Sequence, residues 1–397
     1  MNKKSILIFG AGKIGRSFIG QLFGLSGYEV VFSDIDAELV HLLNERKSYP
    51  VVIKSENEET IIVPNVRAIN GANKQAVIID EVQNTSIVAV SVGKNALVHI
   101  IPIIAQGILK RYERNADLPL NIIIAENMRS GDEFIRQELQ KHLPSDYPLT
   151  KLIGLIETSI GKMVPIMTKE DLDNDPLAVF AEPYNELILD GEAFIGKIPD
   201  VQGLSPKKNI KAWVDRKAFI HNLGHATAAY YGNFKHPEAK YIFEVLQDVE
   251  VIEFVKKTMH QSAAVLLKIY SEDFTKEHLD NHIDDLLRRF QNKHLKDTIF
   301  RIGQDLPRKL GPNDRFMGII RLAMQQGMEY DQILKAMVYG FSFKATDENG
   351  ERAKPDILFD SYMTIGLDYT FQKVCGLIPG KNKNIINQIK SYYNTIN

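Results

Sequence analysis

Three polar side chains interrupt an otherwise apolar stretch at residues 215–232, DRKAFIHNLGHATAAYYG. They are Lys217, Asn222 and His225, and a helix advancing about 100° per residue places them near 0°, 140° and 80° around its axis. One helix face can therefore present an amine, a carboxamide and an imidazole to a single ligand. Such groups are costly to bury without partners. The alternatives are that they are satisfied core residues, or that Lys217 extends its amine to solvent along its aliphatic stem.

A glycine-rich turn near the start of the chain predicts a dinucleotide site. Gly10, Gly12 and Gly15 form G-x-G-x-x-G between a β-rich run, SILIF, and an amphipathic segment. The first glycine permits a tight turn, the second lets a pyrophosphate approach the backbone, and the third lets helix and strand pack closely. The N-terminus of the helix would face the phosphates.

Asp34 ends a second strand-like run, YEVVFSDID, about 20 residues beyond the glycines. A carboxylate at this point accepts hydrogen bonds from the adenosine ribose and repels a 2′-phosphate, so we expect NAD rather than NADP. The predicted cofactor-binding residues are Gly10, Gly12, Lys13, Ile14, Gly15, Asp34, Val92 and Gly93.

Strand-like and helical runs continue to alternate after Asp34. Residues 60–64, 75–80 and 86–93 are predicted strands, and residues 96–112 form an amphipathic helical pattern. The small residues after the strand at 86–90 would let the backbone lie close to a cofactor, which is why Val92 and Gly93 belong to the predicted set.

A further buried strand, LNIIIAENM, ends in Glu126 and Asn127. Ligands of open α/β sheets bind outside the carboxyl ends of strands, so Asn127 is well placed to contact the reacting end of a substrate. The alternative is that Asn127 caps a helix beginning near Arg129. Further strand-like runs are LIGLIETSI and FAEPYNELIL.

The composition divides the chain into two parts. Gly, Pro and Lys collect at residues 196–210, and helical periodicity dominates beyond them. We therefore predict an α/β fold in which a Rossmann-type NAD-binding domain, residues 1–205, precedes a mostly α-helical substrate and catalytic domain, residues 206–397.

The bulk composition is that of a folded enzyme-sized protein. The 397 residues are 44% hydrophobic and 25% charged, and a net charge of −2 gives no reason to expect nucleic-acid binding. The single cysteine, Cys375, excludes an internal disulfide and fits a reducing compartment. No apolar run approaches a membrane span of about 18 residues. We expect a cytoplasmic protein with no membrane partner.

A late segment, residues 289–315, is rich in cations. Most of them are expected on a solvated face, but two or three could line a pocket for an anionic or polyhydroxylated substrate. In this interpretation Pro307 ends a helix that contains Arg301, and Lys309 lies just beyond it. The cations are Arg289, Lys296, Arg301, Arg308, Lys309 and Arg315.

Three separated motifs together resemble the polyol-specific long-chain dehydrogenases, or mannitol dehydrogenase family, and most closely its mannitol-1-phosphate 5-dehydrogenases. The motifs are GAGKIGR, AENM and K-x-x-x-x-N-x-x-H, and similarity extends over nearly the whole chain. The resemblance implies a Rossmann domain, a helical C-terminal domain, and a catalytic lysine that works without a metal. The absence of a Cys/His/Glu zinc pattern agrees with the last point. Close members also suggest a monomer.

Carried over by motif, the resemblance assigns a role to each of the polar groups. Lys217 becomes the general acid/base, Asn127 and Asn222 the donors that stabilise the developing alkoxide, and His225 a substrate contact. The substrate-binding positions of the later segment fall on Arg301 and Lys309.

One departure from the family pattern concerns the substrate. The family carries Asp-Arg before Ile-Val-Pro, whereas this chain has Gly161-Lys162 before Met163. Lysine cannot reproduce the bidentate grip of arginine. The departure leaves the residues for hydride transfer in place and affects only the identity of the substrate. The resemblance implies a sugar phosphate such as fructose 6-phosphate, with a hexuronate or free mannitol as alternatives. An NAD-binding sensor without catalysis is the competing interpretation outside the enzymes.

Overall fold

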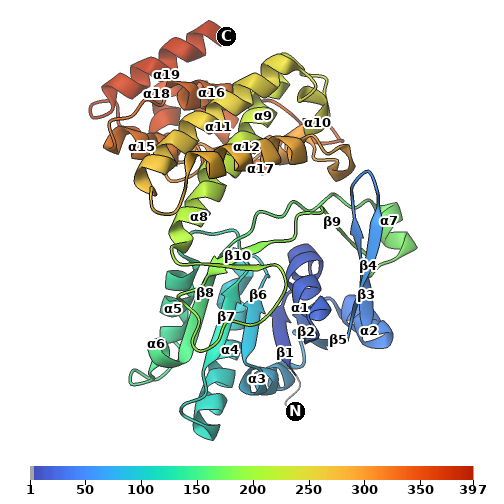
Figure 1. Cartoon of the computed structure of the whole chain (residues 1–397). Coiled ribbons are helices and arrows are strands. Elements are labelled where there is room, and N and C mark those ends of the chain that lie inside the picture. Colours follow the sequence, from blue (N-terminus) through green and yellow to red (C-terminus); the bar gives the residue numbers. More distant parts are fainter. Residues whose placement is uncertain (1–3, 397) are drawn as a thin grey trace. The chain divides into compact units, whose positions relative to one another are not determined.

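The computed structural model describes residues 4–396, and the chain divides into two compact units after Val214 (Figure 1). The predicted boundary at residue 205 falls earlier. Strand β11 (Leu204–Lys207) still belongs to the sheet of the first unit, and Ile210 and Val214 of α8 (Ile210–Arg216) pack against Ile188 of that sheet.

The first unit is built on a sheet of eight strands in the order β11-β10-β8-β7-β6-β1-β2-β5. The run from β8 to β5 is parallel throughout, whereas β10 pairs antiparallel with β8. This order, with β2 and β6 on either side of β1, is that of a Rossmann fold, so the predicted α/β domain is confirmed. The strands are β1 (Ser5–Phe9), β2 (Glu29–Asp34), β5 (Val66–Asn70), β6 (Ile87–Val90), β7 (Leu120–Ile124), β8 (Ile153–Ser159) and β10 (Leu187–Asp190).

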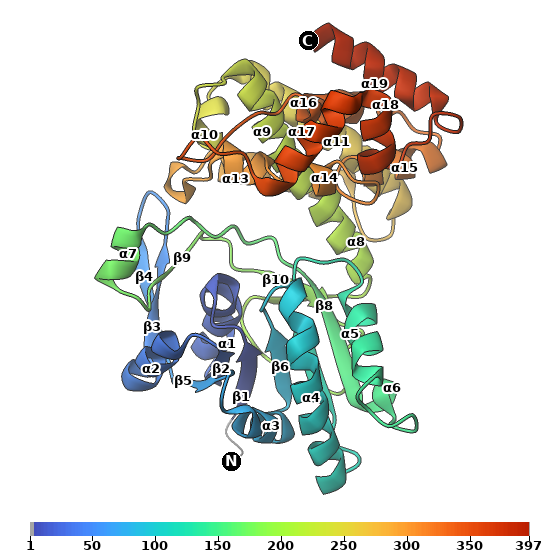
Figure 2. The same ribbon diagram turned by 180° about the vertical axis from the view of Figure 1, so that it is seen from behind.

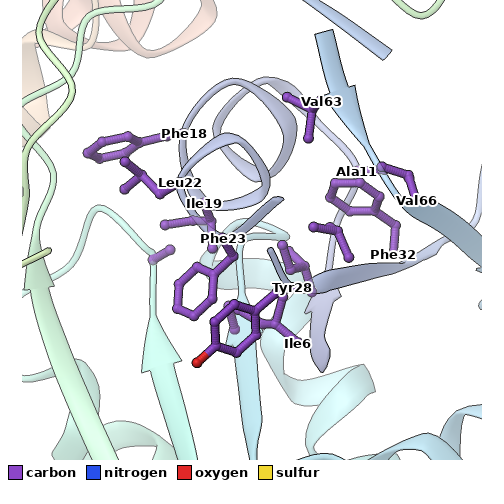
Figure 3. Close-up of a cluster of buried hydrophobic side chains, with 14 of the residues drawn as sticks. Ile6, Ala11, Phe18, Ile19, Leu22, Phe23, Tyr28, Phe32, Val63 and Val66 are labelled. Carbon is purple, nitrogen blue, oxygen red and sulfur yellow. The ribbon is translucent and has the colours of Figure 1, made fainter. Parts of the chain in front are cut away.

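Alternate side chains of the sheet enter two different cores. Ile6 and Ile8 of β1 join a cluster with Phe18 and Phe23 from the segment after the glycine turn (Figure 3). Leu7 and Phe9 face the opposite side, where α3, α4 and α5 lie over the sheet (Figure 2). The helices of this unit are α1 (Gln21–Leu25), α2 (Ala37–Arg46), α3 (Gln75–Asn84), α4 (Lys94–Arg114), α5 (Gly131–Gln140), α6 (Leu149–Leu152) and α7 (Lys169–Asn174).

Two strand predictions in this unit are corrected by the structure. Residues 75–80 belong to helix α3, whose buried side chains Ile78, Ile79 and Val82 follow helical spacing. A short apolar run does not distinguish the two conformations. The run FAEPYNELIL is divided between β9 (Val179–Ala181) and β10, because Pro183 lacks the amide donor that a continuous strand requires. Strand β9 joins β3 (Ser48–Ile53) and β4 (Glu59–Pro64) in a small separate sheet.

The second unit is helical, as predicted. Its buried centre is α9 (Asn222–Lys235), in which every residue from Leu223 to Gly232 is buried and which packs against α11, α13 and α16. The remaining helices are α10 (Ile242–Val245), α11 (Val249–Ile269), α12 (Lys276–Phe290), the 3₁₀ turn η3 (Lys293–Leu295), α13 (Ile299–Gly303), α14 (Leu306–Lys309), α15 (Met317–Gln325), α16 (Asp331–Phe341), α17 (Lys354–Ile365), α18 (Leu367–Thr370), the π-helical turn η4 (Phe371–Cys375) and α19 (Lys383–Ile396). Among residues 4–396, no helix combines the length and apolar character that crossing a membrane requires.

Candidate functional site

The glycine turn after β1 leaves its backbone accessible at one position and closed at two. Gly10 has φ +93°, and a Cβ there would lie 2.3 Å from the carbonyl oxygen of Ser91. A Cβ on Gly15 would lie 2.0 Å from the carbonyl oxygen of Gly10. A Cβ on Gly12 would meet no atom within 4 Å. The outer glycines are thus required by packing, and the middle one faces open space where a pyrophosphate can approach.

Asp34 is tied to the glycine turn by its side chain. Its carboxylate accepts hydrogen bonds from the backbone N–H groups of Ala11, at 2.7 Å, and Asp36, at 3.0 Å. Each carboxylate oxygen accepts one of these bonds and keeps a lone pair. The geometry therefore leaves Asp34 able to accept from ribose hydroxyls.

Arg16 also stabilises the glycine turn. The sequence alone did not predict a role for it. Its buried guanidinium donates from Nε to the carbonyl of Ala11, at 2.6 Å, and from Nη1 to that of Leu177, at 2.7 Å. Arg16 is the second residue of a π-helical turn, η1 (Gly15–Gly20). The only sequence signal for it was its position directly after the third glycine.

Glu126 joins the turns that follow β6 and β7. Its Oε1 accepts from the backbone N–H groups of Val92, at 2.7 Å, and Gly93, at 2.9 Å. Burial raises the pKa of this carboxyl, and the two N–H groups partly oppose the rise. Since these two N–H groups are already engaged, a cofactor would meet other atoms of Val92 and Gly93.

Asn127 follows Glu126 directly and is exposed at the end of β7. Ser130 occupies the N-cap position of α5, with no side-chain cap. The alternative that Asn127 caps this helix is therefore wrong.

Lys162 stands where the family resemblance predicts an arginine, and its side chain contacts residues of the first unit. Its buried ammonium donates to Asn185 Oδ1, at 2.7 Å, and lies 5.1 Å from the centre of the Phe18 ring. It therefore links the segment after β8 to the turn that follows the glycines.

The segment carrying the three polar groups is not a uniform α-helix. Between α8 and α9 lies a π-helical turn, η2 (Lys217–His221), closed by a hydrogen bond from the N–H of Asn222 to the carbonyl of Lys217. The Oγ of Ser262 donates to the Phe219 carbonyl, at 2.5 Å, inside this turn. The assumption of a constant 100° per residue is wrong here. Such single π turns are frequent at functional sites.

Lys217 and Asn222 share a cationic neighbour, Arg315. Its Nη1 donates to the backbone carbonyl of Asn222, at 3.2 Å, and its Nε donates to Asp314, at 2.8 Å. Burial lowers the pKa of Lys217 to about 8, and the positive charge of Arg315 contributes to the same shift. The amine thereby reaches the range in which it can take up and release a proton near neutral pH.

His225 is a buried, neutral imidazole. Its ring stacks on that of Phe290 with centres 4.4 Å apart and planes 7° apart. Burial lowers its pKa well below the ordinary value, and nearby cations lower it further. These cations are Arg301, Lys309, Arg315 and Arg289.

The cation-rich segment is divided between interior and solvent. The side chains of Arg289 and Arg315 are only 11% and 9% exposed. Lys309 is buried, and its ammonium donates a hydrogen bond to the carbonyl of Ile302. Lys296 and Arg308 are exposed, in keeping with a solvated face. The side chain of Arg301, 38% exposed, lies between these extremes. The sequence had suggested Arg301 and Lys309 for substrate binding and had given no reason to prefer Arg289 or Arg315.

The prediction that Pro307 ends a helix is wrong. It lies in the first turn of α14, where the missing N–H costs nothing. Helix α14 ends at Lys309, whereas Arg301 belongs to the separate helix α13. Within residues 4–396, no three His, Cys, Asp or Glu side chains are grouped so that they could hold a metal ion.

Two family models match consecutive parts of the chain. The mannitol dehydrogenase Rossmann domain matches residues 4–203, and the mannitol dehydrogenase C-terminal domain matches residues 209–364. The chain is 38% identical to the mannitol-1-phosphate 5-dehydrogenase of Geobacillus stearothermophilus, over 78% of this chain and 79% of that protein. It is 34% identical to that of Streptococcus mutans serotype c, over 88% of this chain and 90% of that protein.

A solved structure shares the fold. The Pseudomonas fluorescens mannitol 2-dehydrogenase, in a ternary complex with NAD and D-mannitol, has a TM-score of 0.77 at 13% identity, covering 100% of this chain and 92% of that one. Identity this low bears on the fold alone. The two domain models and the two sequence relatives show that the chain belongs to the mannitol dehydrogenase family.

Proposed function

We propose that this protein is an NAD-dependent oxidoreductase that interconverts mannitol 1-phosphate and fructose 6-phosphate, with Lys217 as general acid/base and no metal. The observation that carries the proposal is the lowered pKa of Lys217, about 8, at the start of a π turn. Asn222 directly follows this turn, and its carbonyl accepts a hydrogen bond from Arg315. Family membership supports the reaction class, and the two relatives are both named mannitol-1-phosphate 5-dehydrogenase.

The first unit fits NAD as the cofactor. The open space at Gly12 can admit the pyrophosphate, and the carboxylate of Asp34 can accept from the ribose hydroxyls and would repel a 2′-phosphate. NAD, when bound, accepts the hydride that leaves the carbinol carbon. Titration with NADH and NADPH, followed by fluorescence, tests this part directly: binding of NADPH in preference would contradict it.

In the oxidation direction, neutral Lys217 accepts the proton of the substrate hydroxyl as the carbon loses hydride. In reduction, the protonated amine returns that proton to the ketone oxygen. Asn222 and Asn127 donate amide hydrogens to the developing alkoxide, where such donors contribute more than in the ground state. His225 contacts a neighbouring substrate oxygen, and Arg301 and Lys309 bind the polar remainder of the substrate.

The substrate class rests on the cations. Four cations, Arg301, Lys309, Arg315 and Arg289, lie close enough to His225 to lower its pKa, and a positive field of this kind favours an anionic substrate. A hexuronate such as tagaturonate or fructuronate would satisfy them as a sugar phosphate does, and free mannitol would leave them unused. A sensor that binds NAD without catalysis would give no reason for an amine whose pKa is lowered.

A panel of ketoses tests the proposal. Fructose 6-phosphate, tagaturonate, fructuronate and free fructose are each mixed with enzyme and NADH, and NADH consumption is followed. We expect the highest kcat/KM with fructose 6-phosphate. A higher value for a uronate or for free fructose would reassign the substrate, and no turnover with any of the four would favour the sensor.

Removing the charge of Arg315 should move the pH profile upward. In Arg315→Gln the pKa of Lys217 rises, because a like charge that disfavours its protonation is gone. Oxidation needs the neutral amine, so we expect kcat/KM for mannitol 1-phosphate to rise through about pH 8 in the native enzyme. In the variant this rise should occur at a pH higher by on the order of one unit. Arg315→Lys keeps the charge and should retain the native profile. Identical profiles for the Gln and native proteins would contradict this coupling.

Substitution of Glu126 should disturb both the turn at Val92 and Gly93, which its carboxylate holds, and the position of the next residue, Asn127. Glu126→Ala leaves the N–H groups of Val92 and Gly93 without their acceptor. We expect the KM for NAD to rise roughly tenfold, from about 1.4 kcal/mol of lost positioning, and kcat to fall as well. Glu126→Gln keeps an oxygen acceptor at the same place and should remain near the native values. Steady-state kinetics with varied NAD measures both, and a native KM in the alanine variant would show that the turn holds its shape unaided.

A further inference from the structure

A buried carboxylate with no role assigned so far lies beside the substrate histidine. Asp297 is 6% exposed, and its Oδ2 lies 3.6 Å from Nε2 of His225. Its Oδ1 forms an ion pair with Nη2 of Arg301. Within the described part of the chain, Nε2 of His225 and both oxygens of Asp297 are buried without a hydrogen-bond partner, and Nε2 and Oδ2 are within reach of each other. Buried polar atoms of this kind are costly unless they bond to one another.

The backbone around Asp297 is fixed from two sides. Its carbonyl accepts from the N–H of Ile242, at 2.9 Å, and the next residue, Thr298, forms an antiparallel bridge with Tyr241. The Thr298 hydroxyl also caps α13 by accepting from the N–H of Arg301, at 3.1 Å. The carboxylate therefore projects from a position held to both α10 and α13.

The imidazole of His225 has little freedom to tilt, because the Phe290 ring lies nearly parallel to it. A neutral imidazole carries one N–H, and the partner of one nitrogen decides which nitrogen holds the proton. A carboxylate accepts and does not donate when it is ionised. A proton on Nε2 would therefore point at Asp297 and leave Nδ1 as an acceptor for a substrate hydroxyl.

We propose that Asp297 is the positioning residue of this site: its carboxylate accepts the Nε2 proton of His225 and pairs with the guanidinium of Arg301, fixing both substrate-binding groups at once. Its effect on turnover rests on the proposed function of His225 and Arg301. The hydrogen bond itself does not, because it lies wholly within the second unit and can be observed without substrate.

Nuclear magnetic resonance of the full-length protein with ¹⁵N-labelled histidine tests the bond. The ring signals of His225 are those lost in His225→Gln. We expect a protonated Nε2 and an unprotonated Nδ1 in the native protein. Asp297→Asn offers an amide oxygen at the same place and should preserve this pattern. Asp297→Ala should lose it, with Nδ1 protonated in part or all of the molecules.

Kinetics then separates positioning from general stability. With mannitol 1-phosphate and NAD, kcat/KM should fall about 10- to 100-fold in Asp297→Ala, the range found when metal-bound histidines lose an orienting partner, and less in Asp297→Asn. Asp360→Asn is the matched control, because Asp360 also pairs with two cations of the second unit, Lys344 and Arg352, which are not the groups that Asp297 contacts. It should match the native enzyme.

Two results would overturn the proposal. One is a native protein whose His225 carries its proton on Nδ1. The other is an Asp297→Ala protein that keeps both the native ring signals and the native kcat/KM. Should the alanine variant not fold, the native signals and Asp297→Asn still decide. If mannitol 1-phosphate is not turned over, the proposed function fails while the ring signals still test Asp297.

Discussion

Lys217→Ala should lower kcat by about 10²- to 10⁴-fold, the range that a general acid/base contributes. The loss should appear with mannitol 1-phosphate and with fructose 6-phosphate, because the same amine accepts the proton in one direction and returns it in the other. The affinity for NADH should stay near the native value, since the residues proposed to bind the cofactor lie in the first unit. Stopped-flow kinetics and NADH titration measure the two quantities.

A matched control is available on the surface. Lys335 belongs to the same unit and pairs with Asp331 at 3.4 Å. Lys335→Ala should leave turnover unchanged. Native activity in Lys217→Ala would remove the lysine from the mechanism, and a parallel loss of NADH binding would point to misfolding rather than to lost chemistry.

Asn222→Ala is expected to have the second largest effect, a fall in kcat of about 10²- to 10³-fold, typical of a lost oxyanion donor. The KM for mannitol 1-phosphate should change much less, because the hydrogen bond from the side-chain amide of Asn222 strengthens only as the alkoxide develops. The substitution is unusually specific here. Arg315 bonds to the main-chain carbonyl of Asn222, which alanine retains.

The pH profile of Asn222→Ala distinguishes the loss of an oxyanion donor from a change in the pKa of Lys217. With Arg315 still in place, the pKa of Lys217 should remain about 8, and kcat/KM should rise with pH through the same midpoint. A raised KM with native kcat would contradict the oxyanion role. A displaced midpoint would show that the side chain acts through the lysine instead.

The sequence predicted the Rossmann half well because its signals are local. Glycines with fixed steric demands, an apolar strand on either side and Asp34 at the end of the second strand all fall within a short window. The helix α3 was missed for the same reason that makes short windows weak. A six-residue run that is mostly apolar fits either conformation, and burial of Ile78, Ile79 and Val82 against the sheet decided it.

The arrangement of the catalytic segment could not be predicted in the same way. The residue types and spacing of Lys217, Asn222 and His225 were evident, but a π turn has no strong local signature and depends on partners such as Ser262 from α11. Which cations are buried also depends on distant packing. Arg315 and Arg308 look alike in sequence, yet one is enclosed beside Asn222 and the other is exposed.

The number of residues in the π turn at Lys217–His221 decides which side chains share a helix face. A π turn closes over one residue more than an α turn, so it brings Lys217 and Asn222, which a regular α-helix would place about 140° apart, toward one face. If the segment closed into regular α-helix with its length unchanged, the amine and the carboxamide would diverge although neither had been altered. An insertion of one residue into an ordinary helix is a short route by which an ancestor could have brought such groups onto one face. Variation among relatives should accordingly favour exchanges of residue type over gaps in this segment.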